Sequence, residues 1–143
     1  MRIGRICSPK TVSELVECLG TASLDTRIIS GGTDLINYMR ESKIKCDQLI
    51  GMQDIQSLCQ IEDIGDEISI GAASTYSQIQ NHPLIHEHAR CLAVAASKVG
   101  SPQIRNRGTL AGNIANASPA ADGIPPLFVL NAKVETVNGF GLN

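Results

Sequence analysis

The sequence predicts an α/β fold with α+β character in its second part, arranged as two subdomains at residues 1–53 and 54–143. Strand-like and helix-like segments alternate through the first fifty-odd residues, which is typical of a βαβαβ unit with a small parallel sheet. Beyond Met52 the pattern changes to a hairpin followed by helices. The chain has 143 residues, of which 43% are apolar and 18% charged, so it suits one globular domain or a pair of small subdomains.

In the first subdomain, a β-like run stops at Ser8-Pro9, and Val12, Leu15, Val16 and Leu19 then recur at helical spacing until Gly20. Thr33 or Asp34 is expected to cap the second helix. The elements expected here are strands at 2–7, 27–30 and 48–52 and helices at 11–19 and from residue 35 to 39.

In the second subdomain, alternating residues on either side of Gly65-Asp66 predict a hairpin. The elements expected here are hairpin strands at 58–64 and 67–71, helices at 75–81, 83–99 and 124–130, and a strand at 133–137. The last residues, 137–143, resemble a strand and a turn with nothing to pair with. We therefore expect a fold that is incomplete at its C-terminus, as in a truncated product or a fragment, although a frayed natural end is the alternative.

Residues 101–122 are the most informative stretch for function, because glycine, asparagine, proline and arginine gather there with little regular periodicity. A long irregular segment within a globular domain is either disordered or functional. Ile104, Leu110 and Ile114 argue against a purely solvated segment. Because glycine allows a close backbone approach and its amides can converge on an anion, we expect this segment to bind a phosphate-bearing cofactor.

A first glycine turn, Gly31-Gly32-Thr33-Asp34, lies between an expected strand and an expected helix. Free backbone amides at a helix start favour a bound phosphate, and the Thr33 hydroxyl adds a donor. Read alone, the turn is equally a common way to start a helix. Its spacing matches neither the Walker A loop nor G-x-G-x-x-G, so neither a P-loop nor a Rossmann site is supported.

The second glycine turn, Gly108 to Asn113, offers two glycines, a hydroxyl and an amide. Asp122 is a candidate acceptor for ribose or other cofactor hydroxyls, although it is equally suited to cap the helix that follows. Considered alone, Ser118-Pro119 is a simple turn, and Arg105 and Arg107 are solvated surface charges. Two separate glycine turns followed by an acid are better explained by one extended ligand that lies across both.

Composition excludes several classes of function. The net charge is −2 with no basic block, which argues against nucleic acid as a partner. Five widely spaced cysteines, without a C-x-x-C pair, predict reduced thiols in a cytoplasmic protein rather than a zinc or iron–sulfur site. His82 and His86 share a helical face but lack a third ligand, so we expect no metal site. No signal peptide or membrane span is evident. No protein nucleophile or general base stands out, so no catalytic side chain is assigned.

Three motifs resemble one family: Gly31-Gly32-Thr33-Asp34-Leu35, then residues 103–113 (QIRNRGTLAGN), then residues 117–122 (ASPAAD). In order and spacing they are similar to those of the flavin subunit of molybdenum hydroxylases, a family that includes xanthine dehydrogenase, aerobic carbon monoxide dehydrogenase and nicotinate dehydrogenase. The resemblance covers residues 1–137. It implies a two-subdomain FAD-binding fold of the vanillyl-alcohol oxidase-like type, of which residues 54–143 form the N-terminal part of the larger subdomain.

The resemblance also implies a role for particular residues. Two loops would lie against the FAD pyrophosphate, and Asp122 would bind ribityl or ribose hydroxyls. The implied cofactor-binding residues are Ser30, Gly31, Gly32, Thr33, Asp34, Leu35, Gly108, Thr109, Leu110, Ala111, Gly112, Asn113, Ser118 and Asp122. Ala111 stands where the family often has glycine, a mild departure.

By the same resemblance, the chain is an electron-transfer subunit that passes electrons from iron–sulfur clusters through FAD to NAD or another acceptor. The molybdopterin and [2Fe-2S] centres would belong to partner subunits. Two alternatives stay open: a cofactor-free assembly module that keeps the same core, and a stand-alone flavin reductase of the UDP-N-acetylenolpyruvoylglucosamine reductase type. The second is disfavoured because its substrate domain would also be missing. Whether the chain binds FAD alone is left open, because the family continues with further cofactor-contacting segments.

Overall fold

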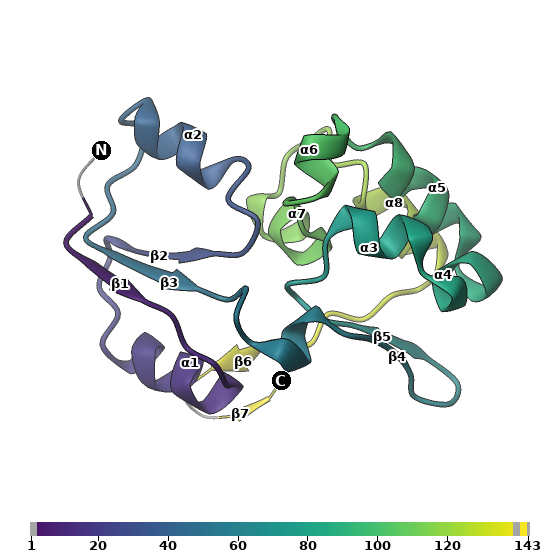
Figure 1. The fold of residues 1–143 in the computed structure, drawn as a ribbon, viewed down its shortest axis with the longest axis horizontal. Coiled ribbons are helices and arrows are strands. Elements are labelled where there is room, and N and C mark those ends of the chain that lie inside the picture. Colours follow the sequence, from purple (N-terminus) through teal and green to yellow (C-terminus); the bar gives the residue numbers. More distant parts are fainter. Residues whose placement is uncertain (1–2, 139–140, 143) are drawn as a thin grey trace.

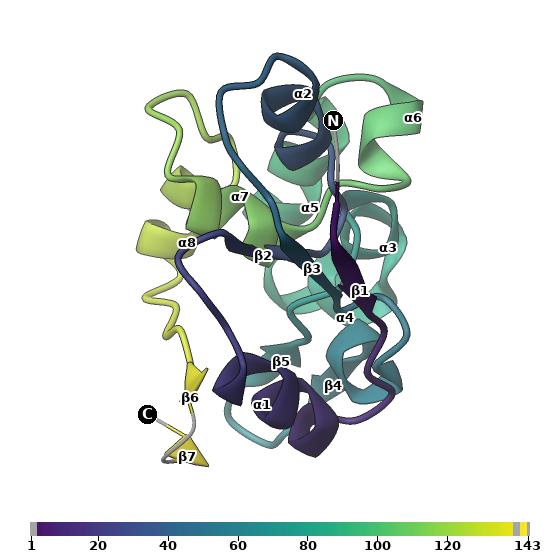
Figure 2. The same cartoon turned by 90° about the vertical axis from the view of Figure 1, so that its left-hand side faces the viewer.

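Three parallel strands form the sheet of the first half, in the order β1-β3-β2 (Figure 1). The computed structural model describes residues 3–138, 141 and 142. The strands are β1 (Arg5–Cys7), β2 (Thr26–Ile29) and β3 (Gln48–Gly51), and the helices that connect them are α1 (Val12–Gly20) and α2 (Leu35–Arg40). The two helices cover opposite faces of the sheet (Figures 1 and 2). The predicted βαβαβ unit is confirmed, although Arg2 lies outside the described residues.

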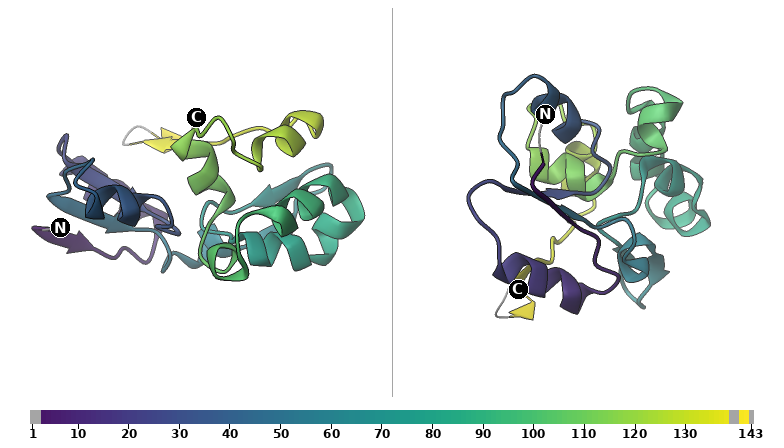
Figure 3. Two further views of the ribbon diagram at one scale, coloured as in Figure 1. Left: turned by 90° about the horizontal axis from the view of Figure 1, so that it is seen from above. Right: turned by 60° about the vertical axis from the view of Figure 1, so that its left-hand side comes forward.

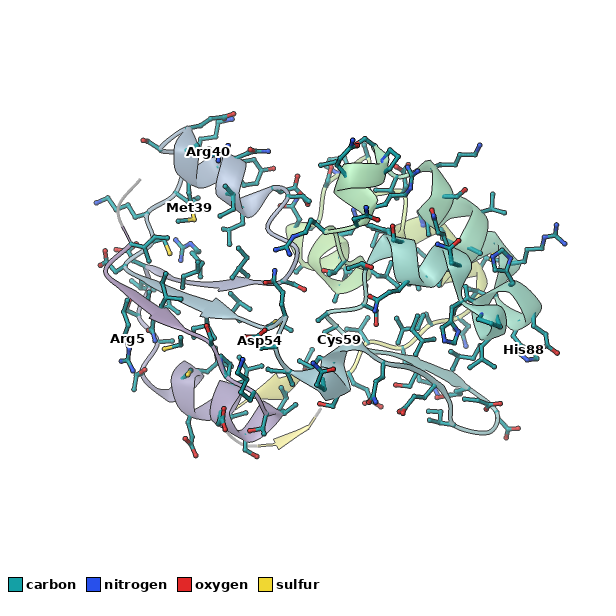
Figure 4. The ribbon with its side chains drawn as sticks, in the orientation of Figure 1. Arg5, Met39, Arg40, Asp54, Cys59 and His88 are labelled. Atoms are coloured by element: carbon teal, nitrogen blue, oxygen red, sulfur yellow. The ribbon has the colours of Figure 1, made fainter. Side chains whose placement is uncertain are left out.

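Each face of this sheet has its own apolar core. On the α1 face, Leu15 packs with Cys7, Ile50 and Ile55. On the α2 face, Met39 packs with Cys46 and Leu49, and Figure 4 shows Met39 pointing from α2 toward the sheet. Period-two alternation along β3 sends neighbouring residues to opposite faces, so one central strand serves both cores.

A short 3-10 helix, η1 (Gln56–Cys59), joins the sheet to the hairpin of β4 (Ile61–Asp63) and β5 (Ile68–Ile70). The hairpin prediction is confirmed, and Gly65 takes φ +98° in its turn, where the Asp63 carboxylate accepts a bond from the Gly65 amide at 2.8 Å. The prediction that Leu58 begins the first hairpin strand is wrong. Leu58 packs against the first core, which the 3-10 turn makes possible. The boundary at residues 53 and 54 stays a prediction.

The second half is mainly helical. Its helices are α3 (Tyr76–Asn81), α4 (Pro83–His88), α5 (Arg90–Lys98), α6 (Pro102–Arg105), α7 (Leu110–Asn116) and α8 (Ile124–Val129). Their shared core is built from Ile79, Ile85, Leu92 and Ala96, each at most 1% exposed. The helices expected at 75–81 and 124–130 are confirmed.

The single helix expected at 83–99 is wrong, because the chain turns at Ala89 (φ −137°, ψ 44°) and forms α4 and α5. The turn lets both helices pack against α3, which one straight helix along this segment would not do. The irregular segment expected at 101–122 is also partly helical. Ser101 and Thr109 cap α6 and α7 through their side chains, and these local caps compensate for the weak periodicity.

After α8 the chain returns to the first half, where β6 (Val137–Asn138) lies beside α1 and pairs antiparallel with β7 (Gly141–Leu142) (Figures 1 and 3). The strand expected at 133–137 is wrong except at Val137, because residues 131–136 run exposed between the two halves. The expectation that the last strand lacks a partner is also wrong, since β7 pairs with it. The expected turn at Gly139 and Phe140 and the last residue, Asn143, lie outside the described residues.

Candidate functional site

The first glycine turn links the end of β2 to the start of α2 and touches the second half of the chain. The Ser30 hydroxyl donates to the carbonyl of Ala72 at 3.4 Å, and the Gln53 amide donates to the carbonyl of Ser30. Gly32 takes φ +75°, a conformation that favours glycine. The expected side-chain cap is wrong: Asp34 occupies the N-cap position with helical backbone angles and caps no amide. Its carboxylate is therefore directed elsewhere.

The backbone amides of this turn are free. Among the hydrogen bonds of the described residues, none is donated by the backbone N–H groups of residues 31–35. Ile36 is the first residue after the turn whose backbone amide donates to a backbone carbonyl, that of Gly32 at 3.1 Å. Successive amides without internal acceptors form a concave surface that suits an anion. The turn is thus able to bind a phosphate.

The second glycine turn is short, because Thr109 caps α7 immediately after Gly108. The Thr109 hydroxyl accepts a bond from the Gly112 amide at 3.1 Å. Thr109 is 4% exposed and Leu110 5% exposed, so both are anchored in the second half. The expectation of an irregular loop over this motif is wrong, because Thr109 starts a helix and Leu110 gives it a buried side.

The two turns lie against each other, as the hypothesis of one shared ligand requires. A Cβ atom added at Gly31 would stand 2.1 Å from the carbonyl oxygen of Arg107, and one at Gly108 would stand 3.7 Å from the hydroxyl of Thr33. The Asn116 amide donates to the Asp34 carboxylate at 3.3 Å, which ties α7 to the first turn. Segments far apart in sequence therefore meet at one place between the halves.

Tyr76, which sequence reasoning missed, lies at the base of this junction. Its backbone amide donates to the carbonyl of Gly108 at 2.9 Å, and its side chain is 2% exposed. Its buried hydroxyl has no hydrogen-bond partner among the described residues. Burial raises the pKa of Tyr76, and the nearby carboxylates of Asp122 and Asp34 raise that pKa further. A tyrosine inside a short capped helix carries no sequence pattern that would mark it as part of the site.

The third motif forms a turn after α7. Ala117 takes the left-handed conformation (φ 50°) that ends the helix, and the Ser118 hydroxyl accepts a bond from the Ala120 amide at 3.3 Å. Asp122 is exposed and close enough to act on the pKa of Tyr76. The N-cap of α8 is Gly123, not Asp122, and it makes no side-chain cap. The Asp122 carboxylate is therefore available to a ligand.

Comparisons with known proteins give the family of the chain. Residues 2–142 match the family described as the FAD binding domain in molybdopterin dehydrogenase. The chain belongs to this family.

The relatives of this FAD-binding family include the nicotinate dehydrogenase FAD-subunit of Eubacterium barkeri, 42% identical over 135 residues, which are 92% of this chain and 46% of the relative. The carbon monoxide dehydrogenase medium chain of Hydrogenophaga pseudoflava is 33% identical over 115 residues, or 80% of this chain and 40% of the relative. Among solved structures, reconstituted CO dehydrogenase from Oligotropha carboxidovorans has a TM-score of 0.94 at 26% identity and is matched over 100% of this chain and 50% of that one.

These comparisons confirm the family resemblance and the predicted two-part α/β FAD-binding fold. The chain spans about half the length of the curated relatives it matches. Among the described residues, no group of three or more histidine, cysteine or acidic side chains is placed to hold a metal ion. None of the helices in that part of the chain has the length and apolar character needed to cross a bilayer.

A pocket of about 320 Å³ opens next to the second turn, where the two halves of this FAD-binding domain meet. Arg107 and Thr109 line it together with the amide side chains of Gln53, Gln78 and Asn106. Cys59 also lines it, and Figure 4 shows this residue at the junction of the halves. The lining is rich in hydrogen-bonding groups, and its volume suits one part of a ligand rather than a whole dinucleotide.

Proposed function

We propose that this chain binds FAD between its two glycine turns and acts as the electron-transfer subunit of a molybdenum hydroxylase complex. One observation carries the proposal: the turn at 31–35, whose backbone amides are free, lies against the turn at 107–109. A dinucleotide pyrophosphate needs several N–H donors at short range, and free amides supply them without side-chain charge.

The residues of the two turns fit such a group. Gly31 leaves no room for a side chain between the turns, so the backbone itself lines the site. The proposed pyrophosphate contacts come from Ser30, Gly31, Gly32, Thr33, Asp34 and Leu35 on one side and from Gly108, Thr109, Leu110, Ala111, Gly112 and Asn113 on the other. Ser118 is proposed as a further cofactor contact. Asp122, exposed and free of capping, is proposed to accept bonds from cofactor hydroxyls.

Asp34 has a separate part in the proposal. Its carboxylate is repelled by phosphate, and its bond from the Asn116 amide at 3.3 Å directs it toward α7. In this position it links the first turn to α7. FAD supplies the reversible two-electron chemistry when bound, and the residues of this chain bind and orient it.

The electron path and the partners are part of the same proposal. Relatives are named as subunits of nicotinate, carbon monoxide and xanthine dehydrogenases, so we infer that partner subunits carry molybdopterin and [2Fe-2S] centres. Electrons would pass from the iron–sulfur centres through FAD to NAD or another acceptor, as in a xanthine dehydrogenase-like enzyme. The five free thiols support a cytoplasmic location.

A titration of the purified full chain with FAD, followed by flavin fluorescence and absorbance, tests the proposal. The wild-type chain is expected to take up FAD, and Gly32→Val and Gly112→Val are expected to abolish uptake. Valine strains the backbone at Gly32, and at Gly112 a Cβ would stand 2.8 Å from the Thr109 hydroxyl. Gly20→Val is the matched control, because no atom lies within 4 Å of its Cβ position.

Two results would contradict the proposal. Normal FAD uptake by both turn variants would show that the cofactor binds elsewhere. Absence of FAD uptake by the wild-type chain, with its helical circular dichroism intact, would favour the cofactor-free assembly module instead.

A further inference from the structure

The pocket beside the second turn has hydrogen-bonding side chains to which the proposed function assigns no role. Its volume of about 320 Å³ is at the lower end for ligand pockets. Both halves of the chain line it: Gln53 follows β3, Gln78 lies on α3 and Arg107 precedes α7. None of the described residues that line it is acidic. Asp54, the acid next to Gln53 in the chain, is paired with Lys10 at 2.7 Å. The lining therefore has a positive charge and no carboxylate to neutralise it.

The side-chain oxygens of two lining residues already accept hydrogen bonds. The Gln78 side-chain oxygen accepts from the backbone amide of Thr75 at 2.7 Å and from the Thr75 hydroxyl at 3.0 Å. The Asn106 side-chain oxygen accepts from the Ser77 hydroxyl. These bonds orient both side-chain amides and leave their nitrogen ends for another partner.

The donors of the same two side chains are unused. A side-chain amide has two N–H donors. Among the side-chain hydrogen bonds of the described residues, none is donated by the amide nitrogen of Gln78 or of Asn106. Gln53 differs, because its amide nitrogen donates to the carbonyl of Ser30 and its oxygen is left as an acceptor. The lining thus offers more free donors than free acceptors, which favours a ligand group that only accepts.

The two arginines of the second motif differ in the same way. The Arg105 guanidinium donates to the carbonyls of Val99 at 3.1 Å and Gly100 at 3.0 Å, so it holds the backbone before α6. Within the part of the chain that the structure describes, the Arg107 guanidinium makes neither a hydrogen bond nor an ion pair. An arginine fork presents five N–H donors with a fixed charge, which suits an oxyanion.

We propose that this pocket is an anion site that binds a phosphate group through the Arg107 guanidinium and the amide N–H groups of Gln78 and Asn106. Three separate donor groups match the three free oxygens of a phosphate monoester better than the two oxygens of a carboxylate. The site is additional to the pyrophosphate contacts proposed above, which use backbone amides. The phosphate group comes from FAD or from a second small molecule, and the experiment below separates these sources.

Calorimetric titration of the full, FAD-free chain with inorganic phosphate at low salt tests the site. Arg107→Gln is expected to weaken phosphate binding about 10-fold, at the lower end for a charge-assisted hydrogen bond because Arg107 is exposed. Arg40→Gln is the matched control, since Figure 4 shows Arg40 on α2, away from Cys59 in the pocket lining. Equal phosphate affinity in Arg107→Gln and Arg40→Gln would overturn the proposal.

A second variant tests the pocket without removing the arginine. Asn106→Asp keeps an oxygen that can accept from the Ser77 hydroxyl and replaces the N–H donors by a negative charge. It is expected to weaken phosphate binding by at least about 10-fold. Gln103→Glu adds the same charge on α6, outside the pocket lining, and is expected to change the affinity less than about 2-fold. Equal losses in both variants would show a general charge effect and exclude a site in the pocket.

Repeating the titration with FAD bound identifies the source of the phosphate group. Phosphate that still binds, and still depends on Arg107, shows that the pocket takes a second molecule. Loss of phosphate binding, together with FAD uptake that is about 10-fold weaker in Arg107→Gln, shows that the group belongs to FAD. If the wild-type chain takes up no FAD, the proposed function fails, and the titration of the FAD-free chain still decides whether the anion site exists.

Discussion

The contact between Gly31 and Arg107 offers the sharpest test of the site. In Gly31→Ala the new Cβ would stand 2.1 Å from the Arg107 carbonyl oxygen, 2.8 Å from its carbon and 2.9 Å from the Gly108 Cα atom. All three are backbone atoms, so no side-chain rotation relieves the overlap. The two turns must separate, or the first turn must distort.

The size of the effect follows from this geometry. Ordinary contact begins near 3.4 Å, so the Arg107 carbonyl and the Cβ must move apart by 3.4 − 2.1, or about 1.3 Å. Overpacking of this kind costs about 1–3 kcal/mol. If the cost falls on the arrangement that binds FAD, the dissociation constant rises about 5- to 150-fold, because 1.4 kcal/mol corresponds to a factor of ten.

Two measurements check this prediction. A fluorescence titration with FAD gives the dissociation constant, and urea unfolding of the ligand-free chain gives the free energy of unfolding. Gly20→Ala is the control, since no atom lies within 4 Å of its Cβ position. If Gly31→Ala binds FAD as tightly as Gly20→Ala does, the contact between the turns has no part in the cofactor site.

Two further predictions concern the second half. Thr109→Ala removes the α7 cap and is expected to lower the free energy of unfolding by about 1 kcal/mol and to weaken FAD binding. The control is Thr11→Ala, which removes the corresponding cap of α1. It should lower the free energy of unfolding by the same amount and leave FAD binding unchanged. Because the pKa of Tyr76 is raised in the folded state, the unfolded chain loses this proton first, and stability should fall above pH 10 by up to about 1.4 kcal/mol per pH unit. This part of the decline should vanish in Tyr76→Phe and persist in Tyr38→Phe, as urea unfolding against pH would show; an unchanged slope in Tyr76→Phe would contradict the assignment.

Much of the first half was predictable because its patterns are local. The spacing of Val12, Leu15 and Leu19 marks α1, and the run from Leu49 to Met52 marks the central strand. Where a predicted element was wrong, tertiary packing determined the structure that the chain adopts. Ala89 has no sequence pattern that breaks a helix, yet the chain turns there so that α4 and α5 both reach α3.

The cofactor motifs were recognisable from residue types, but their geometry was not. Glycine at 31, 32 and 108 indicates a close backbone approach without naming the partner of that approach. The structure supplies the partner, since Gly31 lies against Arg107. No sequence pattern marked Tyr76 as part of the site, because its burial near the carboxylates of Asp122 and Asp34 is a property of the folded chain.

By itself, the sequence determined the family, the βαβαβ unit and the residues of both glycine turns, because each depends on short-range spacing along the chain. Only the tertiary structure decided that the turn after β2 and the turn before α7 meet. Such contacts join residues whose separation along the chain leaves no periodic pattern. They form when the apolar surfaces of α3 and α5 are buried against each other and that of α1 is buried against the sheet, and local propensity does not encode which surfaces meet.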